Sequence, residues 1–83
     1  MPQRRNEITS QIRSEPMAYI AVYNASNQVI HEAWADPGTP AATEAWVACK
    51  HTYDGSGNMT KTEWADGAKF NQSGSDLTTL TYT

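Results

Sequence analysis

The chain contains only one cysteine, Cys49, which excludes an internal disulfide framework. Many small secreted domains need such a framework. We therefore expect the chain to stay in a reducing compartment or to be stabilised by assembly with other chains. It also has no apolar run with the length of a signal-peptide core or a transmembrane helix. We therefore expect no membrane partner.

Charged residues are scarce. They make up 18% of the 83 residues, against about 25% in typical soluble domains, and small polar residues take their place. This composition suits strands and turns better than surface helices, which usually carry many Glu and Lys side chains. The net charge is −3, divided into +1 for residues 1–16 and −4 for residues 17–83. Because phosphate contacts need a basic surface, nucleic acid is not expected to be a main partner.

Residues 1–16 differ in composition from the rest of the chain. They are polar and charged, and their two sizeable apolar residues have the i, i+4 spacing of a short helix face. Pro16 ends the segment, because the residue before a proline avoids the helical conformation. We predict an N-terminal arm, extended or partly helical, that docks on other subunits. Its candidate contact residues are Arg4, Arg5, Ile8, Ile12 and Arg13.

Residues 17–83 predict a β domain. Runs of β-branched and aromatic residues indicate strands at 18–23, 28–35, 58–65 and 76–83, separated by segments rich in Gly, Asn, Asp and Pro. Residues 41–48 fit a helix or a strand, and we expect a short turn followed by a strand from about Ala45. The predicted fold is mainly β: a small antiparallel sheet or sandwich of two repeated β-hairpins plus a C-terminal strand.

An internal repeat supports this fold. A shift of 30 residues places 23–36 on 53–66, with identical Tyr, Ser, Trp, Ala and Asp positions. Each unit is a strand that ends in Tyr, a polar turn, and a strand that ends in Trp-Ala-Asp. The repeat therefore predicts two equivalent hairpins at about 20–36 and 50–66, with Trp34 and Trp64 on the same face. The residues that define it are Tyr23, Trp34, Asp36, Tyr53, Asp54, Gly57, Asn58, Trp64 and Asp66.

The second hairpin resembles the YD repeat of RHS-type proteins, whose core is Tyr-Asp-x-x-Gly-Asn. Tyr53, Asp54, Gly57 and Asn58 match all four positions, whereas the first hairpin keeps only Tyr23. Proteins of that type use many copies to build long β-sheet shells or stalks. Two copies cannot enclose a shell, so the resemblance implies the hairpin and not the function.

The whole chain is also similar in style to small bacteriophage virion proteins, because a polar arm precedes a compact β domain with few charges. This resemblance implies a structural assembly subunit, such as a capsid decoration or head or tail accessory protein. Its partners would be copies of itself or capsid and tail proteins. Its location would be the virion, and otherwise the cytoplasm.

Sequence motifs for chemistry are incomplete. Cys49 and His51 have the spacing of a zinc pair, and His31 could approach them, but no further ligand follows at a suitable spacing. Asp54 opens a calcium-like loop that lacks the required later ligands. We therefore expect no enzyme activity, metal, cofactor or small-molecule ligand.

The tryptophans leave one alternative function open. Trp34, Trp46 and Trp64 fit core and interface packing best. Exposed Trp and Tyr side chains would instead suit a small glycan- or protein-binding β module.

Overall fold

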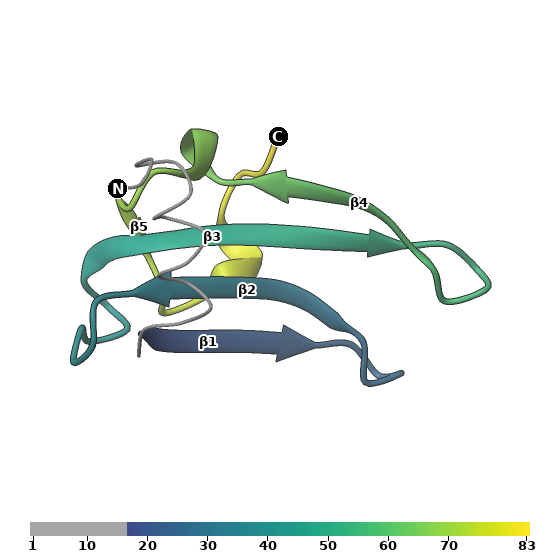
Figure 1. Ribbon diagram of the computed structural model, residues 1–83, viewed down its shortest axis with the longest axis horizontal. Helices are drawn as coiled ribbons and strands as arrows, with labels where there is room; N and C mark the ends of the chain where they lie inside the picture. The colour runs from purple at the N-terminus through teal and green to yellow at the C-terminus, as the bar shows by residue number, and fades with distance from the viewer. Residues whose placement is uncertain (1–16) are drawn as a thin grey trace, which may run out of the picture.

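The computed structural model describes residues 17–83, and the predicted docking arm with Arg4, Arg5, Ile8, Ile12 and Arg13 lies outside the described residues. The strands are β1 (Ala18–Tyr23), β2 (Val29–Ala35), β3 (Glu44–Tyr53), β4 (Met59–Trp64) and β5 (Gln72–Ser73). The first four form an open antiparallel meander, and β5 pairs with the start of β3 (Figure 1). Two 3₁₀ turns, η1 (Asp66–Ala68) and η2 (Leu77–Thr79), complete the fold.

The predicted mainly β fold is confirmed, as an open sheet and not a sandwich. Residues 44–48 belong to β3, and the turn before them is closed by the amide of Thr43, which donates to Pro40 O at 3.1 Å. No helix within residues 17–83 is long and apolar enough to cross a membrane.

The predicted strand at 76–83 is wrong. The Asp76 carboxylate accepts hydrogen bonds from the amide and hydroxyl of Thr78 at 3.1 and 2.6 Å, and these local bonds favour a 3₁₀ turn over a strand. Beyond the turn the chain is extended, and Tyr82 forms an isolated bridge with Ala65. The predicted loop at 66–75 likewise contains η1 and β5.

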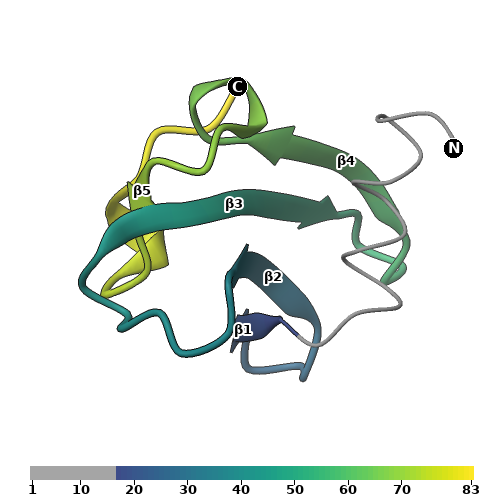
Figure 2. The ribbon, with the colours of Figure 1, turned by 60° about the vertical axis from the view of Figure 1, so that its left-hand side comes forward.

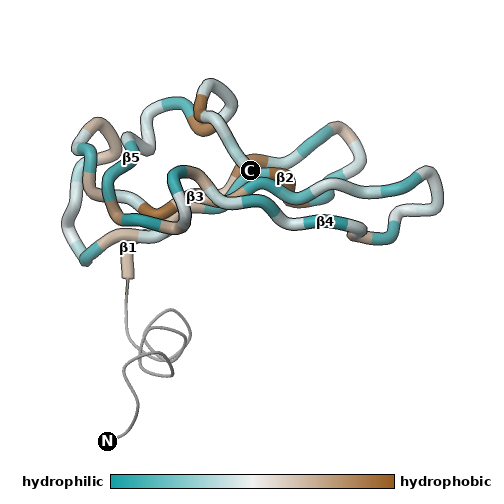
Figure 3. Tube along the Cα trace, turned by 90° about the horizontal axis from the view of Figure 1, so that it is seen from above, coloured by the Kyte–Doolittle hydropathy of each residue, from teal (hydrophilic) through white to brown (hydrophobic). Residues whose placement is uncertain are grey.

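The two hairpins are equivalent in detail. Each has a register shift just before its tyrosine, between Val22 and Tyr23 and between Thr52 and Tyr53. The side chains of Asn24 and Asp54 each accept two backbone amides of the following turn at 2.9–3.0 Å. The turn positions occupied by Asn27 and Gly57 both have positive φ, 62° and 85°, which Asn and Gly adopt most readily. The two tips project from the same end of the sheet (Figure 3).

The core lies between one face of the sheet and the segment that follows β4. Its buried members are Ala33, Ala35, Trp46, Ala48, Ala65 and Leu77. Leu77 reaches it from η2, and Tyr82 packs beside it and donates its hydroxyl to Leu77 O at 2.7 Å. Figure 2 shows this C-terminal segment beside the β3–β5 end of the sheet. Small alanine side chains on the strands allow the segment to approach closely, and we call this side the core face.

His31 is a buried polar residue on the core face. His31 is 8% exposed, its ring lies 5.3 Å from the Tyr82 ring, and its Nδ1 has no hydrogen-bond partner among residues 17–83. Burial, followed by the positive charge of Lys50 and the nearby His51, lowers the pKa of His31, while Asp76 opposes this shift.

This environment predicts that acidification destabilises the protein. The unfolded chain binds a proton at His31 near pH 6.5, whereas the folded chain resists protonation there. The contribution of His31 to the free energy of unfolding is therefore complete above that pH and is lost progressively below it. Urea unfolding at pH 7.5, 6 and 5 should show falling stability, and His31→Leu should flatten the slope. Equal slopes for the two proteins would contradict the assignment to His31.

Candidate functional site

The opposite face of the sheet carries a row of three aromatic side chains, Tyr19, Trp34 and Trp64, from β1, β2 and β4. Ring centroids lie 5.6 Å apart for Tyr19 and Trp34 and 6.2 Å apart for Trp34 and Trp64. Tyr19 pairs with Trp34 in the first hairpin, and Cys49 pairs with Trp64 in the second. Each residue of the second pair lies 30 positions after its equivalent in the first, as the repeat predicts. We call this side the aromatic face. Trp46 lies on the core face, so the three tryptophans do not form one surface.

The aromatic row packs against itself and is not an open platform. Both tryptophans are half-buried and their rings are tilted by 32° against each other, whereas Tyr19 is 50% exposed. A sugar ring needs a free aromatic surface on which to stack. The geometry therefore favours the packing interpretation of Trp34 and Trp64.

Glu32, Cys49 and His51 form a polar cluster on the aromatic face. Glu32 on β2 pairs in register with Cys49 on β3, and His51 lies two residues further along β3, on the same side of the strand. His51 Nε2 is 2.5 Å from Glu32 Oε1 and 3.6 Å from Cys49 Sγ. The three ligating atoms all lie within 4.8 Å of one another, and Cys49 and His51 are buried.

Two further side chains orient this cluster. The Tyr19 hydroxyl donates to Glu32 Oε2 at 2.7 Å, and Thr62 Oγ1 lies 2.8 Å from His51 Nδ1. Both ends of the imidazole and both carboxylate oxygens therefore have partners. Four strands hold the cluster and its two partners, because β3 contributes Cys49 and His51 and each of β1, β2 and β4 contributes one side chain.

The cluster lacks the properties of a cysteine nucleophile. Cys49 is 1% exposed, and burial together with the Glu32 carboxylate raises the pKa of its thiol to about 12. At neutral pH the group is therefore a thiol, whereas the thiolate is the reactive form. Cys49 and Glu32 also approach the same nitrogen of His51, so Glu32 does not orient the ring from the far side as the third group of a triad does.

The structure separates one of the three residues that the sequence allowed to approach one another, and it adds a residue that the sequence did not indicate. His31 does not join Cys49 and His51, because it pairs in register with Lys50 and its side chain belongs to the opposite face. Sequence reasoning missed Glu32. A signal was present: the 30-residue offset equates Glu32 with Thr62, and both positions precede a repeat tryptophan by two residues and flank β3.

The other repeat residues serve the hairpins and their exits. Tyr53 donates its hydroxyl to Val29 O at 2.7 Å and thereby ties the second hairpin to the first. The backbone amide of Asn58 donates a hydrogen bond to Asp54 Oδ1 at 2.9 Å. Asp36 O accepts the amide of Thr39 at 3.1 Å where the chain leaves β2, and Asp66 begins η1 after β4. Tyr23 is 59% exposed.

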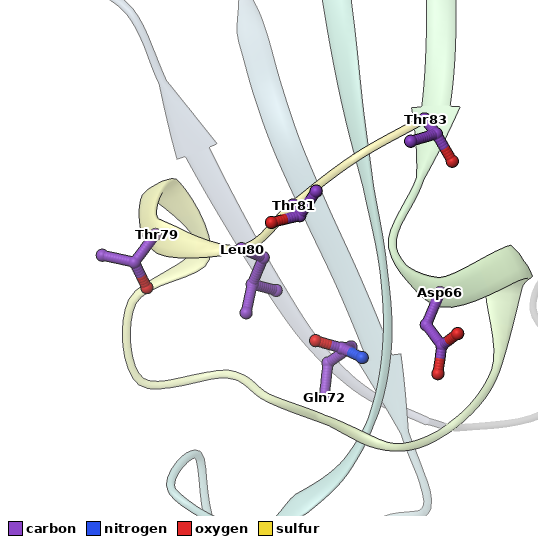
Figure 4. Close-up of a pocket in the computed structure, with 6 residues that line it drawn as sticks. All are labelled: Asp66, Gln72, Thr79, Leu80, Thr81 and Thr83. Carbon is purple, nitrogen blue, oxygen red and sulfur yellow. The ribbon is translucent and has the colours of Figure 1, made fainter.

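An open depression of about 480 Å³ lies between η1 and the C-terminal segment (Figure 4). It is lined by Asp66, Gln72, Thr79, Leu80, Thr81 and Thr83. The one carboxylate side chain in this lining, that of Asp66, already accepts a hydrogen bond from Asn71 Nδ2 at 2.6 Å and lies 3.8 Å from Lys69 Nζ. A general acid–base pair needs a second titratable group that faces the first, and the side chains that line this depression supply none.

The two edges of the sheet are unlike each other. β1 is Ala-Tyr-Ile-Ala-Val-Tyr, with no charged residue and no proline, and within residues 17–83 only β2 pairs with it. β4 at the other edge carries Lys61 and Glu63, and its end is covered by Thr83, which exchanges two backbone hydrogen bonds with Trp64 at 3.1 and 3.2 Å. Charges protect an edge strand from pairing with other chains, and β1 has none.

Comparison with models of known protein families, with curated proteins and with solved structures finds no match to this chain.

Proposed function

We propose that the protein is a structural assembly subunit and not an enzyme, and that it associates with a second copy of itself through the edge of β1. The assembly in this proposal is a bacteriophage virion, in which the protein would be a capsid decoration protein or a head or tail accessory protein. The observation that carries the proposal is the contrast between the charged, partly covered β4 edge and the uncharged β1 edge.

The sequence of β1 favours pairing with a further strand. Four of its six residues are aromatic or β-branched, and none is charged. Among the described residues 17–83, its outer amides and carbonyls are therefore available to another backbone. Strand addition at an edge is an established way for subunits to associate, because main-chain hydrogen bonds supply the affinity.

A second copy fits this edge well. In an antiparallel pair about a two-fold axis through Ala21, Ile20 lies opposite Val22 of the second copy, and Ala21 lies opposite itself. Ile20 and Val22 both pack against the core face, so the pairing would continue that apolar surface across the dimer. No charged side chain of β1 meets another, because the strand contains none.

Sedimentation velocity over a range of protein concentrations tests this proposal. We expect the wild-type chain to form a dimer that dissociates on dilution. Ala21→Lys should shift the equilibrium to monomer, because the two introduced ammonium groups would face each other across the axis, and like charges directly opposite are destabilising.

Thr60→Lys is the matched control, because Thr60 is exposed on β4 at the opposite edge. It should leave the dimer intact, and circular dichroism should show that both variants fold. A wild-type chain that stays monomeric at every concentration, or an Ala21→Lys variant that associates as wild type does, would overturn self-association through β1. A gene position among capsid and tail genes is the expected result for the virion assignment, and a position away from them would contradict it.

A further inference from the structure

We propose that Glu32, Cys49 and His51 form a zinc site on the aromatic face of the sheet. The site is independent of assembly through β1. The sequence alone predicted no metal at Cys49 because it supplied only a Cys-x-His pair, and the structure adds a third ligand from the neighbouring strand.

The distances fit tetrahedral coordination after one small adjustment. Zn–S bonds of about 2.3 Å and Zn–N bonds of about 2.0–2.1 Å place sulfur and nitrogen about 3.6 Å apart at a tetrahedral centre. Cys49 Sγ and His51 Nε2 are 3.6 Å apart. Glu32 Oε1 is 2.5 Å from the same nitrogen and must move by about 0.8 Å to reach the tetrahedral spacing. The side chain of Glu32 is 20% exposed and carries the rotatable bonds needed for that movement.

The groups around the ligands favour this metal site. Ligating histidines almost always use their second nitrogen to hold an outer partner, and ligating carboxylates are in turn hydrogen-bonded. Thr62 Oγ1 holds His51 Nδ1, which leaves Nε2 as the ligand atom. The Tyr19 hydroxyl holds Glu32 Oε2, which leaves Oε1 as the ligand atom.

Zinc is the metal that this donor set selects, because a thiolate, an imidazole and a carboxylate are its usual ligands. Three protein ligands leave the fourth position for water, as in zinc sites that are not closed by a fourth side chain. On binding, the Cys49 thiol loses its proton to solvent as the S–Zn bond forms. The hydrogen that His51 Nε2 shares with Glu32 Oε1 also leaves to solvent, while Nδ1 carries the remaining ring proton and donates it to Thr62 Oγ1, so that the lone pair of Nε2 binds the metal.

Cobalt and zinc titrations of the full chain test this proposal. Added Co²⁺ should produce a thiolate-to-metal charge-transfer band that reaches its maximum at one ion per chain and disappears when Zn²⁺ is added. Native mass spectrometry should show one Zn²⁺ per chain after gel filtration. The apparent affinity should rise with pH, because binding releases a proton from Cys49.

Variants locate the site. Cys49→Ser should abolish the charge-transfer band, and Glu32→Gln should weaken zinc binding although it can still contact Tyr19 and His51. Thr62→Val should weaken binding about 10- to 100-fold, the usual cost of removing an outer partner. His31→Leu is the matched control, because His31 lies on the core face, and it should bind zinc as the wild type does.

Two results would overturn the proposal. One is a wild-type chain that gives no charge-transfer band and retains no zinc after gel filtration. The other is zinc binding that persists unchanged in Glu32→Gln and Cys49→Ser while His31→Leu loses it, which would place the metal elsewhere. The cobalt spectrum of the wild-type chain requires no substitution, so it decides the matter even where a variant fails to fold. Neither result depends on the oligomeric state of the protein.

Discussion

Replacing Leu77 with alanine is expected to lower the free energy of unfolding by about 2–5 kcal/mol, the usual range for a buried leucine. Leu77 is 1% exposed and belongs to a core whose other buried members are four alanines and Trp46. The alanines on the strands are too small to fill the space that its side chain would leave, and η2 is held by local hydrogen bonds that limit its movement towards the sheet.

Urea unfolding followed by tryptophan fluorescence measures this effect, and Leu80→Ala is the control. Leu80 packs against the same core but is only half-buried, so its truncation should cost less. If Leu77→Ala were no more destabilising than Leu80→Ala, the C-terminal segment would not supply the central contact of the core.

The second large effect is expected at Gly74, where alanine should destabilise the fold by roughly 1–3 kcal/mol, as overpacking of a core does. A Cβ atom at Gly74 would lie 2.8 Å from Ile20 Cδ1 and 3.3 Å from both Ala41 O and Trp46 Cδ2. The amide of Gly74 also donates to Ala41 O at 2.7 Å, so the backbone cannot easily retreat. Position 74 is therefore a glycine because its neighbours leave no room for a side chain.

Gly55→Ala is the matched control for Gly74→Ala. A Cβ atom at Gly55 would meet no atom of residues 17–83 within 4 Å, and both substitutions reduce the freedom of the unfolded chain in the same way. The difference between the two thermal midpoints then measures the clash at Gly74. Equal midpoints would show that Ile20 moves aside without cost.

The hairpins could be predicted from the sequence because their signals are local. Asn24 and Asp54 form their turns with residues two to four positions away, and the strands show the expected β-branched and aromatic runs. The C-terminal segment could not be predicted in the same way. The apolar and β-branched residues between 76 and 83 suit a strand by type, but Asp76 bonds to its own neighbours and starts a turn. Residue type alone does not reveal that competition.

The candidate metal site was predictable only in part, for a related reason. Cys49 and His51 are neighbours on one strand, so their shared side follows from the period of two. Glu32 is 17 residues from Cys49, and only the register of β2 against β3 brings them together. A shift of that register by one residue would have moved Glu32 to the core face.

The equivalence of the two hairpins has a consequence for how this protein arose. If one ancestral hairpin was copied, Glu32 and Thr62 descend from a single ancestral position, and they now reach the same imidazole from opposite sides of β3. One copy kept or acquired a carboxylate that can bind a cation, and the other a hydroxyl that can only steer the ring. The contacts to His51 are thus divided between two strands, and neither hairpin alone contains the complete arrangement.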